Sequence, residues 1–307
     1  MSEIDLRVKF GNLTLKNPVL LASGTVGYGN EISQFTDLSK IGAIITKSVS
    51  LKPRKGNPPQ RIVETASGML NAIGLANVGL EVFVKEKIPF LKEIQSTIIC
   101  NIAASSIEEY VECTKVLDKE EEIKGFEINV SCPNVKEGGL EFGNNLTAVG
   151  KITEKVRAVT DKPIIIKLSP NVARISEFAK VAKDEGADAV SAINTLVGTA
   201  FDIWTGKPKI YNVTGGLSGP AIKPVALAKV LEISRNVDIP IIGVGGIMNW
   251  KDAVEFMIAG ATAIQIGTVN FINPQAGIEI IEGLKNYCKQ KEITSLSEII
   301  ASYKLPS

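Results

Sequence analysis

The sequence predicts an α/β fold in which eight parallel strands, each followed by a helix, close into a (β/α)8 barrel. Eight short apolar runs alternate with polar or glycine-rich loops and helical segments along the chain. The runs are mostly apolar, as is typical of strands buried on both faces, and strand–helix alternation favours parallel pairing. A doubly wound open sheet is the runner-up, but residues 22–27 after the first run lack the glycine spacing of that fold.

The expected elements follow one another in the order that such a barrel requires. A short N-terminal β-hairpin is expected at residues 6–10 and 13–15, where polar and apolar residues alternate. The eight barrel strands are expected at residues 18–22, 43–46, 97–101, 126–130, 164–168, 189–193, 241–244 and 263–266. Helical spacing between them predicts helices that include residues 107–117, 148–159, 175–185, 224–234 and 250–259.

Two connections are too long to be simple turns. Residues 48–79 follow the second expected strand, residues 194–222 follow the sixth, and both are rich in Gly, Pro and Asn. Long loops in compact domains are usually lids or binding loops, and on a barrel they would lie beside the active site. Beyond residue 266 the chain has room for a closing helix and a short tail, so one domain is expected over residues 1–307.

Composition limits the class of protein. The chain is 45% hydrophobic and 22% charged, as soluble globular proteins are, and 34 basic against 33 acidic residues leave a net charge of +1. This balance gives no overall attraction for nucleic acid or an anionic membrane. The first seven residues carry two acids and no apolar run, so they do not resemble a signal peptide. We expect a cytoplasmic protein with no nucleic-acid or membrane partner.

Cys132 is the candidate catalytic residue. The chain contains no histidine, so a proton taken from carbon near neutral pH must go to Cys, Lys, Tyr, Asp or Glu. Cys132 follows the fourth expected strand and precedes Pro133, which cannot continue that strand. The alternative is a small buried hydrophobe, which is the interpretation we favour for Cys100 inside the third strand. The four cysteines are far apart and form no CxxC pair, so we expect reduced thiols and no metal site.

The carboxyl ends of the expected strands, where barrel active sites lie, carry many polar residues. They are Ser23, Lys47, Ser48, Asn101, Asn129, Ser131, Cys132, Lys167, Ser169, Asn194, Thr195, Gly245, Gly246, Gly267 and Thr268. Each alone could be an ordinary loop residue. Two lysines, three asparagines and a cysteine converging on one mouth nevertheless indicate a functional site.

Glycines after the seventh and eighth strands predict the place of a phosphate. Backbone N–H groups of residues 243–247 and of Gly267–Thr268, near a helix N-terminus, could hold a dianion. The alternative interpretation makes them tight-turn glycines. With a phosphate at this end, Lys167 would lie under the ring system of a phosphate-bearing cofactor, where its charge would stabilise the anion of a reduced flavin.

Asparagines in the first long loop offer a second recognition element. The segment from Asn71 to Asn77 places asparagines on both sides of Gly74. They could simply form turns, but an amide side chain also supplies the donor and the acceptor that match a planar imide. Asn129 and Asn194 offer the same chemistry from the strand ends, so the implied substrate is small, polar and rich in amide groups.

At these residues the chain resembles the dihydroorotate dehydrogenases over nearly its whole length. The resemblance rests on residues 46–48, 71–77, 129–134, 193–195, 243–247 and 267–268. It implies an FMN-containing barrel that oxidises (S)-dihydroorotate to orotate in de novo pyrimidine (UMP) biosynthesis. Cys132 would take the proton from C5 while a hydride passes from C6 to N5 of FMN.

The resemblance also assigns binding roles to individual residues. Those implied to hold FMN are Ser23, Lys47, Ser48, Asn101, Asn129, Lys167, Ile193, Gly219, Gly245, Gly246, Gly267 and Thr268. Those implied to hold substrate are Lys47, Asn71, Ala72, Ile73, Gly74, Leu75, Asn129, Asn194 and Thr195.

Within the family the chain is most similar to the soluble, NAD-linked class 1B. Cysteine at position 132, the form of residues 71–75 and that of residues 136–139 carry this likeness. It implies a heterotetramer in which two copies of this chain join two electron-transfer subunits that carry FAD and a 2Fe–2S cluster. The alternatives are a fumarate-linked dihydroorotate dehydrogenase, an FMN-dependent tRNA-dihydrouridine synthase, and a barrel that binds a phosphorylated ligand without catalysis. The synthase would need a basic RNA-binding face and a C-terminal helical domain.

Overall fold

The computed structural model describes residues 4–130 and 142–305, and within them eight parallel strands close into a barrel. Their order around the barrel is β10-β13-β14-β3-β4-β7-β8-β9. The strands are β3 (Val19–Leu21), β4 (Ala43–Ile45), β7 (Thr97–Ile102), β8 (Ile123–Asn129), β9 (Ile164–Lys167), β10 (Ala189–Ala192), β13 (Ile241–Val244) and β14 (Ala263–Ile266). The predicted barrel is confirmed, and β8 begins three residues earlier than the expected 126.

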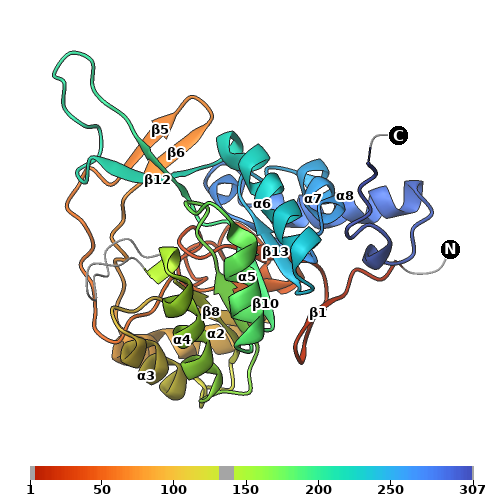
Figure 1. Ribbon diagram of the computed structural model, residues 1–307, viewed down its shortest axis with the longest axis horizontal. Coiled ribbons are helices and arrows are strands. Elements are labelled where there is room, and N and C mark those ends of the chain that lie inside the picture. The colour runs from red at the N-terminus through yellow and green to blue at the C-terminus, as the bar shows by residue number, and fades with distance from the viewer. Residues whose placement is uncertain (1–3, 131–141, 306–307) are drawn as a thin grey trace.

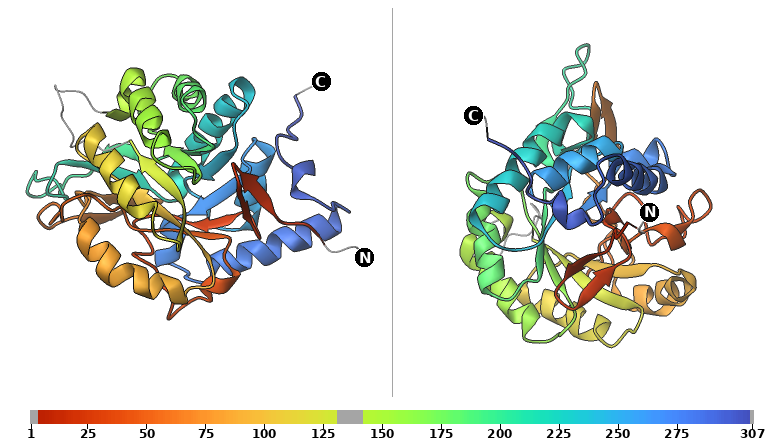
Figure 2. Two further views of the ribbon diagram at one scale, coloured as in Figure 1. Left: turned by 90° about the horizontal axis from the view of Figure 1, so that it is seen from below. Right: turned by 90° about the vertical axis from the view of Figure 1, so that its right-hand side faces the viewer.

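The principal helices cover the outside of the barrel, as the ring of coils in the right-hand view of Figure 2 shows. They are α3 (Ile107–Leu117), α4 (Leu146–Arg157), α5 (Ile175–Asp184), α6 (Lys223–Asn236), α7 (Trp250–Ile258) and α8 (Ala276–Gln290). Side chains fix where several of them begin: Ser106 caps α3, and Asn145 caps α4, which begins two residues before the expected 148. Among the described residues, no helix combines the length and apolar character needed to cross a bilayer.

Shorter helical pieces connect the larger elements. After the first long connection come α1 (Leu80–Val82), the π-helical turn η2 (Phe83–Lys87) and α2 (Ile88–Glu93). Single turns of 3-10 helix lie at η1 (Leu38–Lys40), η3 (Phe142–Asn144), η4 (Pro220–Ile222), η5 (Thr268–Phe271) and η6 (Leu296–Glu298).

The expected N-terminal hairpin lies at one end of the barrel. Strands β1 (Val8–Phe10) and β2 (Leu13–Leu15) pair antiparallel, and Phe10 and Leu15 are buried. The hairpin and both chain ends lie on the side of the molecule away from β5, β6 and β12, as Figures 1 and 2 show. The amino ends of the barrel strands are therefore covered, and the carboxyl ends face the two long connections.

The two long connections form a four-stranded antiparallel sheet that the sequence did not predict. Its order is β11-β12-β6-β5, and we call it the outer sheet. Its strands are β11 (Leu196–Thr199), β12 (Thr214–Ser218), β6 (Gly68–Asn71) and β5 (Ile62–Thr65). Leu217 pairs with both Leu196 and Leu70, which joins the second connection to the first. The outer sheet stands beside the barrel at the upper left of Figure 1.

Candidate active site

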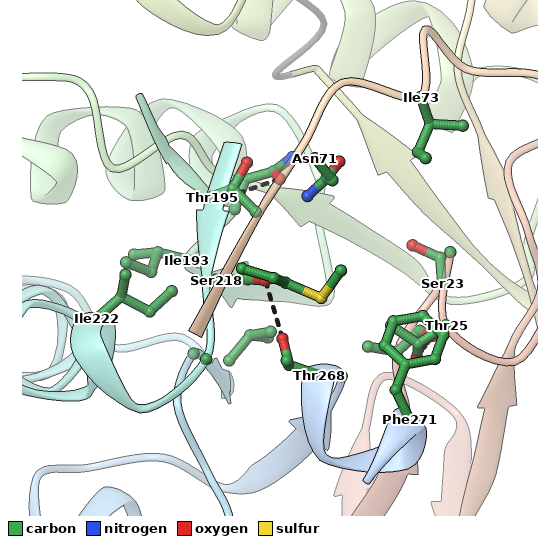
Figure 3. Close-up of a pocket in the computed structure, with 18 of the residues that line it drawn as sticks. Ser23, Thr25, Asn71, Ile73, Ile193, Thr195, Ser218, Ile222, Thr268 and Phe271 are labelled. Atoms are coloured by element: carbon green, nitrogen blue, oxygen red, sulfur yellow. Dashed lines mark hydrogen bonds between the residues drawn. The ribbon is translucent and has the colours of Figure 1, made fainter. Parts of the chain in front are cut away.

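A cavity of about 330 Å³ lies between the carboxyl ends of the barrel strands and the outer sheet, and Figure 3 shows part of its lining. This volume is within the range of small-molecule sites. Most of the predicted site residues line it. They are Ser23, Lys47, Ser48, Asn71, Ile73, Leu75, Asn129, Lys167, Ile193, Asn194, Thr195, Gly219, Gly245, Gly246, Gly267 and Thr268.

Four of the residues predicted to catalyse or to bind FMN or substrate do not line the described cavity. Asn101 lies beneath it: the residue is fully buried, and its amide accepts a hydrogen bond from the Ser48 hydroxyl (2.6 Å). In the segment from 71 to 75, every second residue lines the cavity, while Ala72 and Gly74 lie against Asn57. The Asn57 amide donates to the Ala72 carbonyl (2.9 Å). Cys132 lies outside the described residues. Direct contacts of these four with a ligand stay predictions.

Lys167 lies at the base of the cavity. It ends strand β9, only 6% of its surface is exposed, and its ammonium donates to the Ser23 hydroxyl (3.4 Å) and to the Glu127 carboxylate (3.3 Å). Strand alternation places Glu127 on the same face of β8 as Asn129, so both side chains point into the barrel. The Lys167 ammonium therefore brings a positive charge to the cavity wall, and the Glu127 carboxylate lies on the side of the ammonium away from the cavity.

Amide side chains gather on another side of the cavity. The Asn194 amide donates to the Asn129 side-chain oxygen (3.3 Å), and the Thr195 backbone N–H donates to Asn194 (2.8 Å). Asn71 enters from the outer sheet, where its amide donates to the Gly216 carbonyl (3.2 Å). Figure 3 shows Asn71 and Thr195 on the same side of the cavity. Donors and acceptors on three side chains can match a ligand that carries amide or carboxylate groups.

Glycine is required at Gly246 for two physical reasons. Its φ is +74°, and a Cβ there would lie 2.7 Å from the Lys223 Cβ and 2.9 Å from the Gly219 carbonyl oxygen. The packing of α6 against this turn therefore supports the tight-turn interpretation. The same packing brings the turn to the cavity beside Gly219 and Thr268, so a role in binding phosphate is equally compatible.

An ion-pair cluster holds this turn to the neighbouring helices. The Lys223 ammonium lies 2.7 Å from both Asp252 and Glu255, and these contacts raise the pKa of Lys223, with Asp252 contributing first. The other Asp252 oxygen accepts the backbone N–H of Met248 (2.8 Å). The Thr268 hydroxyl donates to Ser218 (2.9 Å), as Figure 3 shows. Backbone amides and hydroxyls thus meet at one end of the cavity, a donor set that suits phosphate.

The described thiols are unsuited to acid–base chemistry. Burial raises the pKa of Cys100 to about 12 and that of Cys113 to about 12, and Cys288 is buried as well. The interpretation of Cys100 as a buried structural residue is confirmed.

Sequence reasoning missed several residues of the site. Glu127 had a detectable signal, because it is an acid inside an apolar run and lies two positions before Asn129. Thr25, Met69, Ser218 and Phe271 also line the cavity. Met69 and Ser218 belong to strands of the outer sheet, which the sequence did not predict. The rule that active sites lie at the carboxyl ends of barrel strands therefore could not identify them.

Comparison with known proteins agrees with this geometry. The family model for dihydroorotate dehydrogenase matches residues 5–288. The chain belongs to the dihydroorotate dehydrogenase family. The resemblance carried by the sequence motifs is thereby confirmed.

Relatives from this family match the chain from end to end. It is 51% identical over 302 residues to the protein of Geotalea uraniireducens named dihydroorotate dehydrogenase B (NAD(+)), catalytic subunit, covering 98% of this chain and 99% of that one. Proteins with the same name from Thermoanaerobacter sp. (51% over 302 residues, 98% and 100% covered) and Bacteroides thetaiotaomicron (49% over 301 residues, 98% and 99% covered) are similar to it.

Proposed function

We propose that this chain is the catalytic subunit of an NAD-linked dihydroorotate dehydrogenase, which oxidises (S)-dihydroorotate to orotate in pyrimidine biosynthesis. The observation that carries the proposal is one cavity in which a buried lysine, a group of amide side chains and a glycine turn meet. Each part suits one part of the reaction: a ring that gains electrons, a substrate with imide and carboxylate groups, and a cofactor phosphate. The barrel and the outer sheet both line this cavity, which supports the proposal that residues 1–307 form one FMN-binding domain.

The residues present fit FMN, the cofactor of this family. FMN, when bound, supplies the acceptor for the hydride that leaves C6 of dihydroorotate. Gly245, Gly246, Gly267 and Thr268 would hold its phosphate through backbone N–H groups and a hydroxyl. Lys167 would lie at its ring system, where a fixed cation favours a reduced, more negative ring. The remaining proposed contacts are Ser23, Lys47, Ser48, Asn101, Asn129, Ile193 and Gly219.

Substrate would bind on the amide side of the cavity. Lys47 would pair with the substrate carboxylate, while Asn71, Asn129 and Asn194 would match the donors and acceptors of its ring. The segment from Ala72 to Leu75 and Thr195 would complete the pocket. These contacts orient C5 and C6 for reaction, which is how positioning groups lower a barrier.

Cys132 is proposed as the base that takes the proton from C5. It lies outside the described residues, but it follows β8 by three positions, and Asn129 at the end of β8 lines the cavity. The chain has no histidine, and Cys100 and Cys113 are buried with raised pKa values. A cysteine with a reference pKa of about 8.5 needs only modest help to act as a base near neutral pH.

Electrons would leave the chain through a separate subunit. The relatives are named as the catalytic subunit of an NAD(+) enzyme, a name that implies a second subunit. We infer that two copies of this chain assemble with two electron-transfer subunits that carry FAD and a 2Fe–2S cluster, and that the complex works in the cytoplasm. The fumarate-linked enzyme is the alternative for the acceptor.

An anaerobic titration of the purified chain with dihydroorotate, followed by visible flavin absorbance, tests the assignment. Stoichiometric bleaching is expected, with no bleaching by dihydrouracil, the matched control that lacks the carboxylate. A bound flavin that dihydroorotate does not bleach would contradict the substrate and favour the dihydrouridine alternative. A purified chain that binds no flavin would favour the non-catalytic barrel.

The acceptor needs a separate experiment. After reduction by dihydroorotate, NAD(+) added to the isolated chain should reoxidise the flavin slowly or not at all, and addition of the purified electron-transfer subunit should restore the reaction. Fumarate serves as the control acceptor. Rapid reoxidation by fumarate, or by NAD(+) without the second subunit, would contradict the NAD-linked assignment.

A further inference from the structure

Glu127 is a fully buried carboxylate in the middle of the barrel. It accepts four hydrogen bonds from side chains of four different strands. The donors are Asn101 (2.7 Å) and Lys167 (3.3 Å) to one oxygen, and Ser191 (2.9 Å) and Gln265 (2.6 Å) to the other. We call these five residues the polar layer. The sequence alone predicts no contact among these five residues and no role for Glu127.

The contacts of Glu127 are those of an ionised group. All four neighbours present a hydrogen to it, and an ionised carboxylate only accepts hydrogen bonds. The Gln265 amide nitrogen faces the carboxylate and donates to it at 2.6 Å. A buried charge is costly unless it is paired and hydrogen-bonded, and here both oxygens have two donors each.

Lys167 is the member of the polar layer that also lines the cavity. Its ammonium lies between the Glu127 carboxylate (3.3 Å) and the Ser23 hydroxyl (3.4 Å), so the carboxylate holds it at the base of the cavity. The lysine and glutamate side chains are 8% and 0% exposed, so water screens neither charge effectively. The negative charge of Glu127 therefore offsets part of the positive potential that Lys167 brings to the cavity.

We propose that Glu127 is a positioning residue that fixes the Lys167 ammonium at the base of the cavity and, by offsetting its charge, lowers the reduction potential of the flavin bound there. The inference rests on the FMN site of the proposed function. A reduced flavin is more negative than an oxidised one, so a carboxylate behind Lys167 disfavours reduction, and its removal favours reduction.

The midpoint potential of bound FMN in Glu127→Gln tests the proposal. Glutamine keeps the size of the side chain and removes the charge. We expect FMN to bind one per chain and its two-electron reduction equilibrium to shift toward the reduced form by about tenfold, which equals a rise of about 30 mV. An unchanged potential in folded, FMN-loaded Glu127→Gln would overturn the proposal.

Ser191→Ala is the matched control, because it removes one neutral donor to Glu127 and leaves every charge in place. Its potential should stay the same or fall, since the carboxylate loses a partner that stabilises its charge. A rise as large as that of Glu127→Gln would assign the effect to disturbed packing and overturn the proposal.

Glu127→Asp serves if the glutamine variant does not retain FMN. The shorter side chain withdraws the carboxylate from Lys167 without removing it, so a smaller rise in potential is expected, and no rise would overturn the proposal. Wild-type protein without flavin would instead contradict the proposed function, so the two failures are distinguishable.

Discussion

The polar layer of the barrel and the outer sheet both contribute to the cavity, but they are buried to very different degrees. Every residue of strands β9 and β10 is buried, and within the polar layer Glu127 has four hydrogen-bond donors. In the outer sheet, buried and exposed positions mix, and Val197 (66%) and Ile62 (41%) are exposed. Segments with few buried contacts open at lower free-energy cost than a core does.

This difference assigns separate tasks to the two regions. The barrel end holds charged groups in fixed positions, which suits a permanently bound cofactor and the reacting atoms. The outer sheet supplies Asn71 and Met69 from a less buried element, which suits a substrate that must enter and leave. Substitutions in the two regions should therefore affect different measured quantities.

The largest effect is expected from Cys132→Ala. Loss of a general base typically lowers turnover by about 10²–10⁴-fold. FMN should remain bound, because the proposed FMN contacts do not include this side chain. Steady-state turnover and the flavin-to-protein ratio are the measurements. Cys100→Ala is the matched control, since that thiol is buried in β7, and turnover of Cys132→Ala equal to that of this control would refute the base assignment.

Gly246→Ala tests how strictly the barrel end is packed. Alanine at a φ of +74° with a Cβ 2.7 Å from the Lys223 Cβ combines backbone strain and overpacking, together about 2–5 kcal/mol of lost stability, and FMN affinity should fall with it. Gly206 has a similar φ of +67°, but a Cβ at that position would meet nothing within 4 Å, so Gly206→Ala should cost about 1 kcal/mol. Denaturant unfolding of both variants makes the comparison, and equal losses would show that crowding at Gly246 is unimportant.

Cys100 provides a pH-dependent test of the buried barrel wall. Burial raises its pKa to about 12, so above the ordinary cysteine value of about 8.5 the unfolded chain releases this proton before the folded chain does. The part of the unfolding free energy that comes from keeping this thiol protonated is fully present below about pH 9. It is lost as the pH rises toward 12, at about 1.4 kcal/mol per pH unit. The stability difference between wild type and Cys100→Ala should therefore shrink as pH rises.

Denaturant unfolding of wild type and variants across this pH range measures the effect. Cys113→Ala should behave in the same way, because burial raises the pKa of Cys113 to about 12 as well. Trp204→Ala is the control, since this side chain is 89% exposed and carries no thiol. A Cys100→Ala difference as constant with pH as that of Trp204→Ala would mean that Cys100 ionises freely in the folded protein.

The smallest effect is expected from Asn71→Ala in the outer sheet. Loss of one hydrogen bond to substrate costs about 1 kcal/mol, which raises KM by about fivefold, with kcat and the flavin potential nearly unchanged. Asn57→Ala is the control, because Asn57 supports the same segment through Ala72 but does not line the cavity. An equal rise in KM for both variants would show that Asn71 acts only through loop structure.

The barrel could be predicted because its strands are encoded locally. Runs such as Ile-Ile-Ile at residues 164–166 and Ile-Ile-Gly-Val at residues 241–244 are apolar and rich in β-branched residues, so each identifies a buried strand by itself. The outer sheet could not be predicted in this way. Strand β12 reads Thr-Gly-Gly-Leu-Ser, which carries no strand signal, and it forms because segments far apart in the chain pair with it.

The same distinction divides the site. Residues at the ends of barrel strands, such as Lys167 and Asn129, follow from the rule that active sites lie at the carboxyl end. Gly245 and Gly246 were placed correctly at the cavity, although their glycine character is also explained by packing against α6. Interactions between side chains, such as that of Glu127 with Gln265, form only when the barrel closes, so the order of residues along the chain does not predict them.

The polar layer has a consequence for how the protein assembles itself. Its five members come from strands β7, β8, β9, β10 and β14, and β14 joins β13 to β3 where the two ends of the sheet meet. A chain folded only as far as β8 would contain the Glu127 charge without three of its four donors. Half-barrel fragments should therefore bind no flavin, and the change in flavin fluorescence on binding during refolding would report the moment at which the ring of strands is complete.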